Sequence, residues 1–368
     1  MRRQAKNLLF AFGRCVPEKQ IATVAPLRLW TAALAATLCA AAFSQTGLAQ
    51  VPPASILRID VANNVLYLED TDVLKFATVP NATAPAGGHG GNNFNRAVGV
   101  ADIVSVNGLP VSGTHIRSLV NIFSSMAPTP ASGQAIADTV RVAVGVFTFE
   151  ILKSDGTPIG TIVTNGFGGG AAPPGAPLAA TGGNNFAITG GTGAFLGARG
   201  QMEIVANAPG VASQRFASIA EDPTNRRING GGTQHYVVHL IPMSAPQIVI
   251  TPGGPAVTHS ADFSVVTSTK PAAAGEVLSL FATGLGPTVP GVDPGQPFPS
   301  TPLAVVNSPV EVKVNGISAE VLGAAGLPGA VDGYQVNFRV PPGTAKGPAS
   351  IQVSAAWISG TASSISVQ

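Results

Sequence analysis

The residues most capable of chemistry lie on one predicted strand near the middle of the chain. Arg199, Gln201 and Glu203 alternate with Gly200 and Met202, so an extended strand places the three polar side chains on one face. A guanidinium, an amide and a carboxylate that face a cavity could orient and polarise a bound molecule. We therefore treat these three as candidate ligand-binding residues. The alternative is that Arg199 braces the preceding turn or caps the end of the fold.

Glu150 is a second candidate, because it closes the strongly apolar run Val140–Ile151. A carboxyl group buried beside such a strand would suit acid–base chemistry. Alternation places Glu150 on the face opposite to Phe147 and Phe149, and the sequence leaves open which face is inward. Arg199 and Glu150 are thus the two catalytic candidates.

The remaining titratable groups favour structural roles. His235 and His239 share one face of a predicted strand, but they are about 13 Å apart, too far to bind one metal ion. His115 begins an apolar strand, where a core or rim position is expected, and His89 lies in a glycine-rich loop. Four acidic residues cluster near the first strand without a calcium-loop motif: Asp60, Glu69, Asp70 and Asp72. We expect neither a metal nor a cofactor.

Motifs of several enzyme classes are absent from the sequence. No Gly-x-Ser-x-Gly elbow is present, although composition alone leaves a Ser–His–Asp triad open. The glycine-rich stretches 87–91 and 166–175 lack the Lys-Ser/Thr of a phosphate-binding loop. The two cysteines, Cys15 and Cys39, both precede residue 50. Cleavage near residue 50 would leave a chain with neither disulfides nor thiolate ligands.

Residues 1–50 have the features of a secretory signal peptide. Arg28 ends a basic region, Leu29–Phe43 is apolar, and small residues follow at 47–50. The apolar run of 15 residues is short for a membrane span, which needs about 20. We therefore expect cleavage, no transmembrane segment afterwards, and a secreted protein that is extracellular or held at the cell surface. The periplasm is the alternative location.

The charge of the chain excludes one class of partner. Residues 1–50 carry six of the 20 basic side chains and one of the 18 acidic ones, so the remainder has a net charge of −3. Such a chain has no electrostatic footprint for nucleic acid or for anionic membranes. We expect instead a hydrophobic small molecule, or a surface protein or glycan, as the partner, and we leave oligomerisation open.

The elements that position these residues are short strands. Charged residues make up only 10% of the chain, and 44 glycines and 31 prolines separate apolar runs of strand length. Ile56–Leu68 is expected to form a hairpin that turns at Asn63-Asn64. Further strands predict an antiparallel barrel or sandwich over 51–243. The Pro/Gly-rich stretch 244–260 is predicted to be a linker, and about seven strands in 261–368 match an immunoglobulin-like sandwich.

Residues 184–204, NNFAITGGTGAFLGARGQMEI, resemble the signature of the dirigent and allene-oxide-cyclase barrel superfamily. In that superfamily a strand enters a Gly-Gly-Thr-Gly turn, followed by an aromatic residue and Ala-Arg-Gly. The corresponding residues here are Gly190, Gly191, Thr192, Gly193, Phe195, Ala198, Arg199 and Gly200. We expect the glycines at 190, 191 and 193 to allow positive φ in the turn, and the Phe195 ring to plug a barrel end.

This resemblance implies an antiparallel eight-stranded barrel with a central cavity for an apolar small molecule. It also implies the alternative function, which is a barrel that steers cyclisation or radical coupling of a hydrophobic substrate. The superfamily's cavity acids have no counterpart that can be matched residue by residue in this sequence.

Residues 262–368 resemble a second family, the Solibacter-type uncharacterised C-terminal domain of large secreted acidobacterial proteins. The matching pieces are GEVLSLFATGLGP (275–287) and the stretch from VNGIS to VPPG (314–343). No catalytic activity is attached to that family, which is read as a surface or adhesion module. The sequence therefore predicts an exported all-β binding or interaction protein, in preference to an enzyme.

Overall fold

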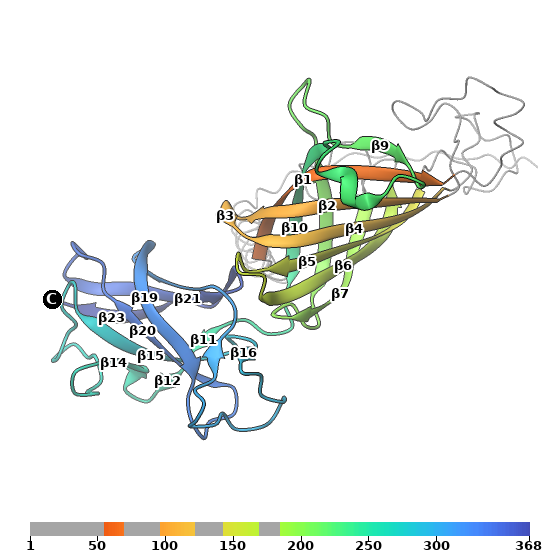
Figure 1. Cartoon of the computed structure of the whole chain (residues 1–368). Coiled ribbons are helices and arrows are strands. Elements are labelled where there is room, and N and C mark those ends of the chain that lie inside the picture. The colour runs from red at the N-terminus through yellow and green to blue at the C-terminus, as the bar shows by residue number, and fades with distance from the viewer. Residues whose placement is uncertain (1–54, 70–95, 122–142, 169–184) are drawn as a thin grey trace, which may run out of the picture. The chain divides into compact units, whose positions relative to one another are not determined.

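The computed structural model describes residues 55–69, 96–121, 143–168 and 185–368 (Figure 1). The predicted signal peptide, His89, Asp70 and Asp72 lie outside the described residues. Within these ranges the protein is all-β, with one short 3-10 helix, η3 (Pro223–Arg226). The described residues hold no helix with the length and hydropathy that crossing a bilayer requires.

Eight antiparallel strands form a closed barrel, which confirms the predicted architecture. The ring closes because β1 pairs with β2 on one side and with β10 on the other. The strands are β1 (Ser55–Glu69), β2 (Arg96–Val106), β4 (Ser112–Asn121), β5 (Ala143–Leu152), β6 (Pro158–Gly168), β7 (Asn185–Gly193), β8 (Arg199–Val205) and β10 (Gly232–Ile241). Two short strands extend the ring: β3 (Leu109–Pro110) beside β2, and β9 (Arg215–Ser218) parallel to β1.

The first strand differs from the prediction. Residues 55–69 form one continuous strand, and the expected hairpin at Asn63-Asn64 is wrong. Asn63 does adopt a positive φ of 51°, but its effect is a bulge that shifts the register with β2 and β10. The Asn63 amide donates a hydrogen bond to Asp102 Oδ2 at 2.9 Å, which ties the bulge to β2.

Apolar side chains from every strand fill much of the barrel interior. Alternation along each strand sends every second side chain inward, where most lie below 3% exposure. Phe195, in the turn after β7, is 1% exposed and packs with this core, as expected for a plug. The other core members include Leu57, Ile59, Ile103, Phe147, Phe149, Ile151, Ile162, Phe186, Ile188, Met202, Val238 and Leu240.

One ionic cluster ties the segment 206–231 to β2, and a second ion pair lies within the segment. Asp102 accepts hydrogen bonds from Arg227 at 2.9 and 2.8 Å and forms an ion pair with Arg226. Arg215 binds both carboxylate oxygens of Glu221, at 3.0 and 2.7 Å. These contacts place β9 beside β1, so that the residues around β9 complete the barrel wall where β10 has ended (Figure 1).

A second sheet of 11 strands follows in the sequence and curls around its own core, which contains Leu280, Val336, Phe338 and Val353. Its longer strands are β15 (Val277–Thr283), β18 (Val310–Val314), β19 (Ile317–Gly326), β20 (Gly333–Arg339), β21 (Gly347–Ala355) and β23 (Ser363–Val367). Its short strands are β11 (Gln247–Ile248), β14 (Val257–His259), β16 (Thr288–Val289), β17 (Val305–Val306) and β22 (Ile358–Ser359).

Two of these short strands lie in the stretch 244–260, which we expected to be a linker. Strands β11 and β14 both pair with β15, and β12 (Ile250–Thr251) forms a small hairpin with β13 (Gly254–Pro255). The Pro/Gly-rich composition therefore marks tight turns between very short strands. The immunoglobulin-like arrangement of the C-terminal strands stays a prediction.

Candidate functional site

The structure places Arg199 and Gln201 on the outer face of the barrel, both exposed. Met202, which lies between Gln201 and Glu203 in β8, points inward and is 1% exposed. Arg199 Nη1 donates to the carbonyl oxygens of Thr189 and Ala198, at 2.9 and 3.0 Å. Arg199 therefore braces the β7–β8 turn and does not face the barrel interior. This is the alternative that the sequence offered to a ligand-binding role.

Glu203 also lies on the outer face, because it is opposite Val237, whose neighbours Tyr236 and Val238 point inward. The side chain is nevertheless buried, and its Oε1 lies 3.9 Å from His239 Nε2. Burial raises the pKa of Glu203 and, with a smaller contribution from the charge of Arg58, lowers the pKa of His239. This pair is separated from the barrel interior by the wall of the barrel.

Glu150 is exposed on the outer face of β5, while Phe147 and Phe149 fill the interior. Glu150 therefore does not meet the condition of burial on which its candidacy depended. The large aromatic side chains take the inward positions, and alternation sends the carboxylate to solvent.

The glycine motif has a different role from the one expected. Among the three turn glycines, only Gly193 has a positive φ, of 61°, and the expectation is wrong for Gly190 and Gly191, which belong to β7. A Cβ on Gly191 would lie 2.4 Å from the carbonyl oxygen of Phe195, so this glycine permits close packing. The turn itself uses Gly197, with a φ of 71°.

Among the described residues, His235 and His239 take part in no catalytic triad. Ser105 Oγ donates to Asp60, and the other oxygen of Asp60 lies 2.7 Å from His235 Nδ1. The carboxylate thus stands between the hydroxyl and the imidazole, whereas nucleophilic catalysis needs the imidazole in the middle. His235 and His239 have separate partners, and no cluster of metal-ligating side chains occurs among the described residues.

Other polar side chains lie inside the barrel, and the sequence assigned none of them to a site. His115 is fully buried in the core, which is one of the two positions expected for it, and its ring stacks on Phe149 with centroids 4.4 Å apart. Its Nδ1 lies 3.1 Å from the carbonyl oxygen of Thr148, and its Nε2 lies 3.0 Å from the Tyr236 hydroxyl.

These contacts fix the protonation of His115 and Tyr236. A carbonyl oxygen only accepts hydrogen bonds, so Nδ1 carries the proton and Nε2 accepts from the Tyr236 hydroxyl. Burial, assisted by the charge of Arg117, lowers the pKa of His115 to about 3, and burial raises the pKa of Tyr236 to about 12. Both groups are neutral near pH 7 and satisfy each other, so they are poor candidates for proton transfer.

Arg117, two residues further along β4, is 6% exposed and points into the barrel. Its Nη2 donates to the side-chain oxygen of Gln214, and its Nε has no hydrogen-bond partner. The Thr164 hydroxyl, on the inward face of β6, is also buried without a partner. Within the described part of the chain, no carboxylate forms an ion pair with Arg117.

The interior is therefore electrostatically unbalanced in the described strands. The structure describes the side chains of four acidic residues on the barrel strands, and alternation and register place all four on the outer face: Asp60, Asp102, Glu150 and Glu203. Arginine keeps its charge even when buried, so Arg117 brings a cation into the interior without a protein counter-ion from these strands. We take the inward groups around Arg117 as the candidate functional site.

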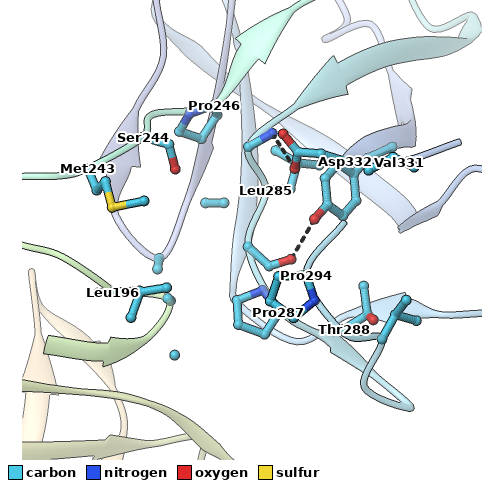
Figure 2. A pocket seen from close by; sticks show the side chains of 18 of the residues that line it. Leu196, Met243, Ser244, Pro246, Leu285, Pro287, Thr288, Pro294, Val331 and Asp332 are labelled. Carbon is cyan, nitrogen blue, oxygen red and sulfur yellow. Dashed lines mark hydrogen bonds between the residues drawn. The ribbon is translucent and has the colours of Figure 1, made fainter. Parts of the chain in front are cut away.

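A pocket beside the segment 284–294 of the C-terminal sheet offers less chemistry (Figure 2). Two of its polar side chains are already used within the sheet: the Tyr334 hydroxyl donates to the carbonyl oxygen of Gly286 at 2.7 Å, and Asp332 Oδ1 accepts from the Gly284 amide at 3.2 Å. Burial, with the nearby Asp332 charge, raises the pKa of Tyr334. These groups stabilise the segment that follows β15.

Comparisons of the chain with protein-family models, with curated proteins and with solved structures gave no match. The two family resemblances in the sequence therefore stay predictions.

Proposed function

We propose that this is an exported binding protein without catalytic activity, whose barrel holds a small and largely apolar molecule. One observation carries the proposal: Arg117 Nε and Thr164 Oγ1 are buried inside the barrel without a hydrogen-bond partner. Nearly all buried polar groups in proteins have a partner, and a bound molecule is a natural source of the missing ones. The aromatic and aliphatic surroundings favour an apolar body for that molecule.

The alternative, a barrel that steers cyclisation or radical coupling, has less support. Such chemistry calls for convergent groups that can move protons or stabilise charge at the reacting atoms. Arg199 and Glu150 face outward, and His115 and Tyr236 are neutral and paired with each other. A binding role needs none of these groups to be reactive.

Export and a surface role for the C-terminal sheet complete the proposal. Export is supported by the basic, apolar and small-residue segments of residues 1–50. The surface role, toward a protein or glycan partner, is supported by the resemblance of residues 262–368 to a non-catalytic module of secreted proteins.

The proposal is tested by a search for ligands of the purified protein. Small molecules that co-purify are identified by mass spectrometry, and a panel of apolar compounds is screened by thermal unfolding. A compound present at 100 times its Kd adds about 2.7 kcal/mol, which raises the melting temperature by about 5 to 10 °C for a domain of this size. A folded protein that neither carries nor responds to any such compound would contradict the proposal.

A further inference from the structure

We infer that the molecule held by the barrel carries an anionic group, a carboxylate or similar oxyanion, that pairs with Arg117. This inference rests on the proposed function and adds the chemical class of the ligand, an organic acid with an apolar body. It follows from three observations around Arg117: the charge balance of the interior, the state of the guanidinium edge, and the apolar neighbours.

The charge balance comes first. A buried cation loses its hydration, and proteins normally compensate this cost with a paired carboxylate. Arg117 is 94% removed from solvent, yet its one protein hydrogen bond in the described structure goes to a neutral amide, that of Gln214. The acids placed on the barrel strands are on the other side of the wall. An anionic ligand would supply the missing charge.

The guanidinium edge is half occupied. The Nε and Nη2 atoms of an arginine donate in parallel, and a carboxylate binds this edge with both of its oxygens. In Arg117 the Nη2 group donates to the side-chain oxygen of Gln214, and the buried Nε has no hydrogen-bond partner. Gln214 precedes β9 in the segment 206–231 and is only half-buried, so its side chain can yield its place to a carboxylate.

A glycine in the barrel wall leaves space for the Arg117 side chain. Gly99 on β2 lies opposite Arg117, and a Cβ at Gly99 would lie 2.2 Å from Arg117 Nε. A glycine here lets the Arg117 side chain lie close against β2.

The neighbours of Arg117 define the rest of the ligand. Leu66, Ala97, Leu119 and Phe216 form an apolar cluster on the inward faces of β1, β2, β4 and β9. Leu66 is directly opposite Gly99, and Ala97 is opposite Leu119, so the cluster adjoins the guanidinium. An inorganic anion would leave these groups unused, whereas an organic acid contacts both them and Arg117.

Matched pairs of acids and alcohols test the inference. The probes are 4-phenylbutyrate with 4-phenylbutan-1-ol, and dodecanoate with 1-dodecanol. Each pair differs in the charged group. Calorimetry measures their affinities for the wild-type protein, for Arg117→Met, and for Arg199→Ala as a control that removes an outward arginine. Circular dichroism checks that every variant is folded, and Arg117→Lys retains the charge if Arg117→Met fails to fold.

For the wild type and Arg199→Ala we expect the acid of a pair to bind about 10- to 100-fold more tightly than the alcohol, the range typical of one hydrogen-bonded charge pair. In Arg117→Met this ratio should fall to about one, while Arg117→Lys should keep part of it. Equal affinity of acid and alcohol for the wild type would overturn the inference and leave the proposed function intact. Failure of every probe and of the wider ligand search would overturn both. Equal stabilisation by inorganic phosphate would overturn the organic-acid class.

Discussion

Gly99 on β2 lies directly across from Arg117 on β4, and the missing side chain of the glycine is the space that the guanidinium occupies. The virtual Cβ of Gly99 falls 2.2 Å from Nε, 2.4 Å from Cγ and 2.8 Å from Cδ of Arg117. Arg117 therefore lies close against the inner wall of the barrel, at Gly99. The orientation of the proposed anion site depends on this pair.

The first prediction concerns Gly99→Ala. The added methyl group must displace the Arg117 side chain, and we expect a loss of about 1 to 3 kcal/mol of stability, as for other overpacked cores. Urea unfolding measures the loss. In the double variant Gly99→Ala/Arg117→Met the cost should largely disappear, because the flexible thioether can move aside.

Gly190→Ala is the matched control for this experiment. Gly190 is also a barrel glycine without positive φ, and the nearest atom to its virtual Cβ is Arg199 Nη1, at 3.9 Å. Its substitution should change stability by less than about 0.5 kcal/mol, as at ordinary surface positions. A larger effect at Gly190 than at Gly99 would contradict the packing described for the two sites.

The second prediction concerns the ligand-free stability of Arg117→Met. Replacing a buried, uncompensated cation by an apolar side chain of similar length should leave the free protein as stable or make it more stable, by about 1 to 4 kcal/mol. Chemical unfolding of ligand-free samples measures this. A loss of more than about 2 kcal/mol would show that Arg117 serves the fold, and the case for an anion site would lose its electrostatic basis.

The third prediction is a pH dependence due to His115. Burial keeps the pKa of folded His115 near 3, against an ordinary value of 6.5, so between these pH values the unfolded chain binds a proton that the folded chain does not. This contribution to stability is complete above about pH 6.5, and below it the folding equilibrium constant falls about tenfold per pH unit until about pH 3.

Stability curves from pH 4 to 8 for His115→Gln and the wild type isolate this contribution. The variant should lose stability less steeply below pH 6.5. Parallel curves for the wild type and His115→Gln would contradict the neutral, buried state that we assign to His115.

The fourth prediction concerns Asp102, which binds both Arg226 and Arg227. Arg227 and the Asn63 amide lower the pKa of Asp102 against the opposing effect of burial, so the carboxylate is ionised near pH 7. Asp102→Asn should release the 206–231 segment, and limited proteolysis within 219–229 should accelerate several-fold at unchanged circular dichroism. An unchanged cleavage rate would contradict the role of Asp102 in holding the segment.

The sequence was sufficient for the all-β class and the closed barrel, because strand-length apolar runs between Gly and Pro turns are a strong local signal. It led to wrong predictions at single positions where the same residues are compatible with two local structures. Asn63-Asn64 can adopt positive φ in a hairpin turn or in a bulge, and the pairing of β1 with both β2 and β10 decided for the bulge.

The sequence did not reveal the candidate site, because β4 buries polar side chains and exposes aliphatic ones. In the run His115–Val120 the apolar Ile116 and Val120 are 46% and 51% exposed, while His115 and Arg117 are buried. Alternation alone would place the aliphatic side chains inside. Only the register with Gly99 and Phe147, which are distant in sequence, turns the polar face of this strand inward.

The central claim is that Arg117 pairs with an acidic ligand inside the barrel, and the most direct measurement is the NMR resonance of its Nε–H group. Arginine side-chain spectra of the wild type, assigned by comparison with Arg117→Met, are recorded during titration with 4-phenylbutyrate and then with 4-phenylbutan-1-ol. We predict a saturable shift of the Arg117 Nε–H signal with the acid, at a concentration that matches the calorimetric Kd, and no comparable shift with the alcohol. A bound acid that leaves this signal in place while shifting the Arg199 signal would contradict the account.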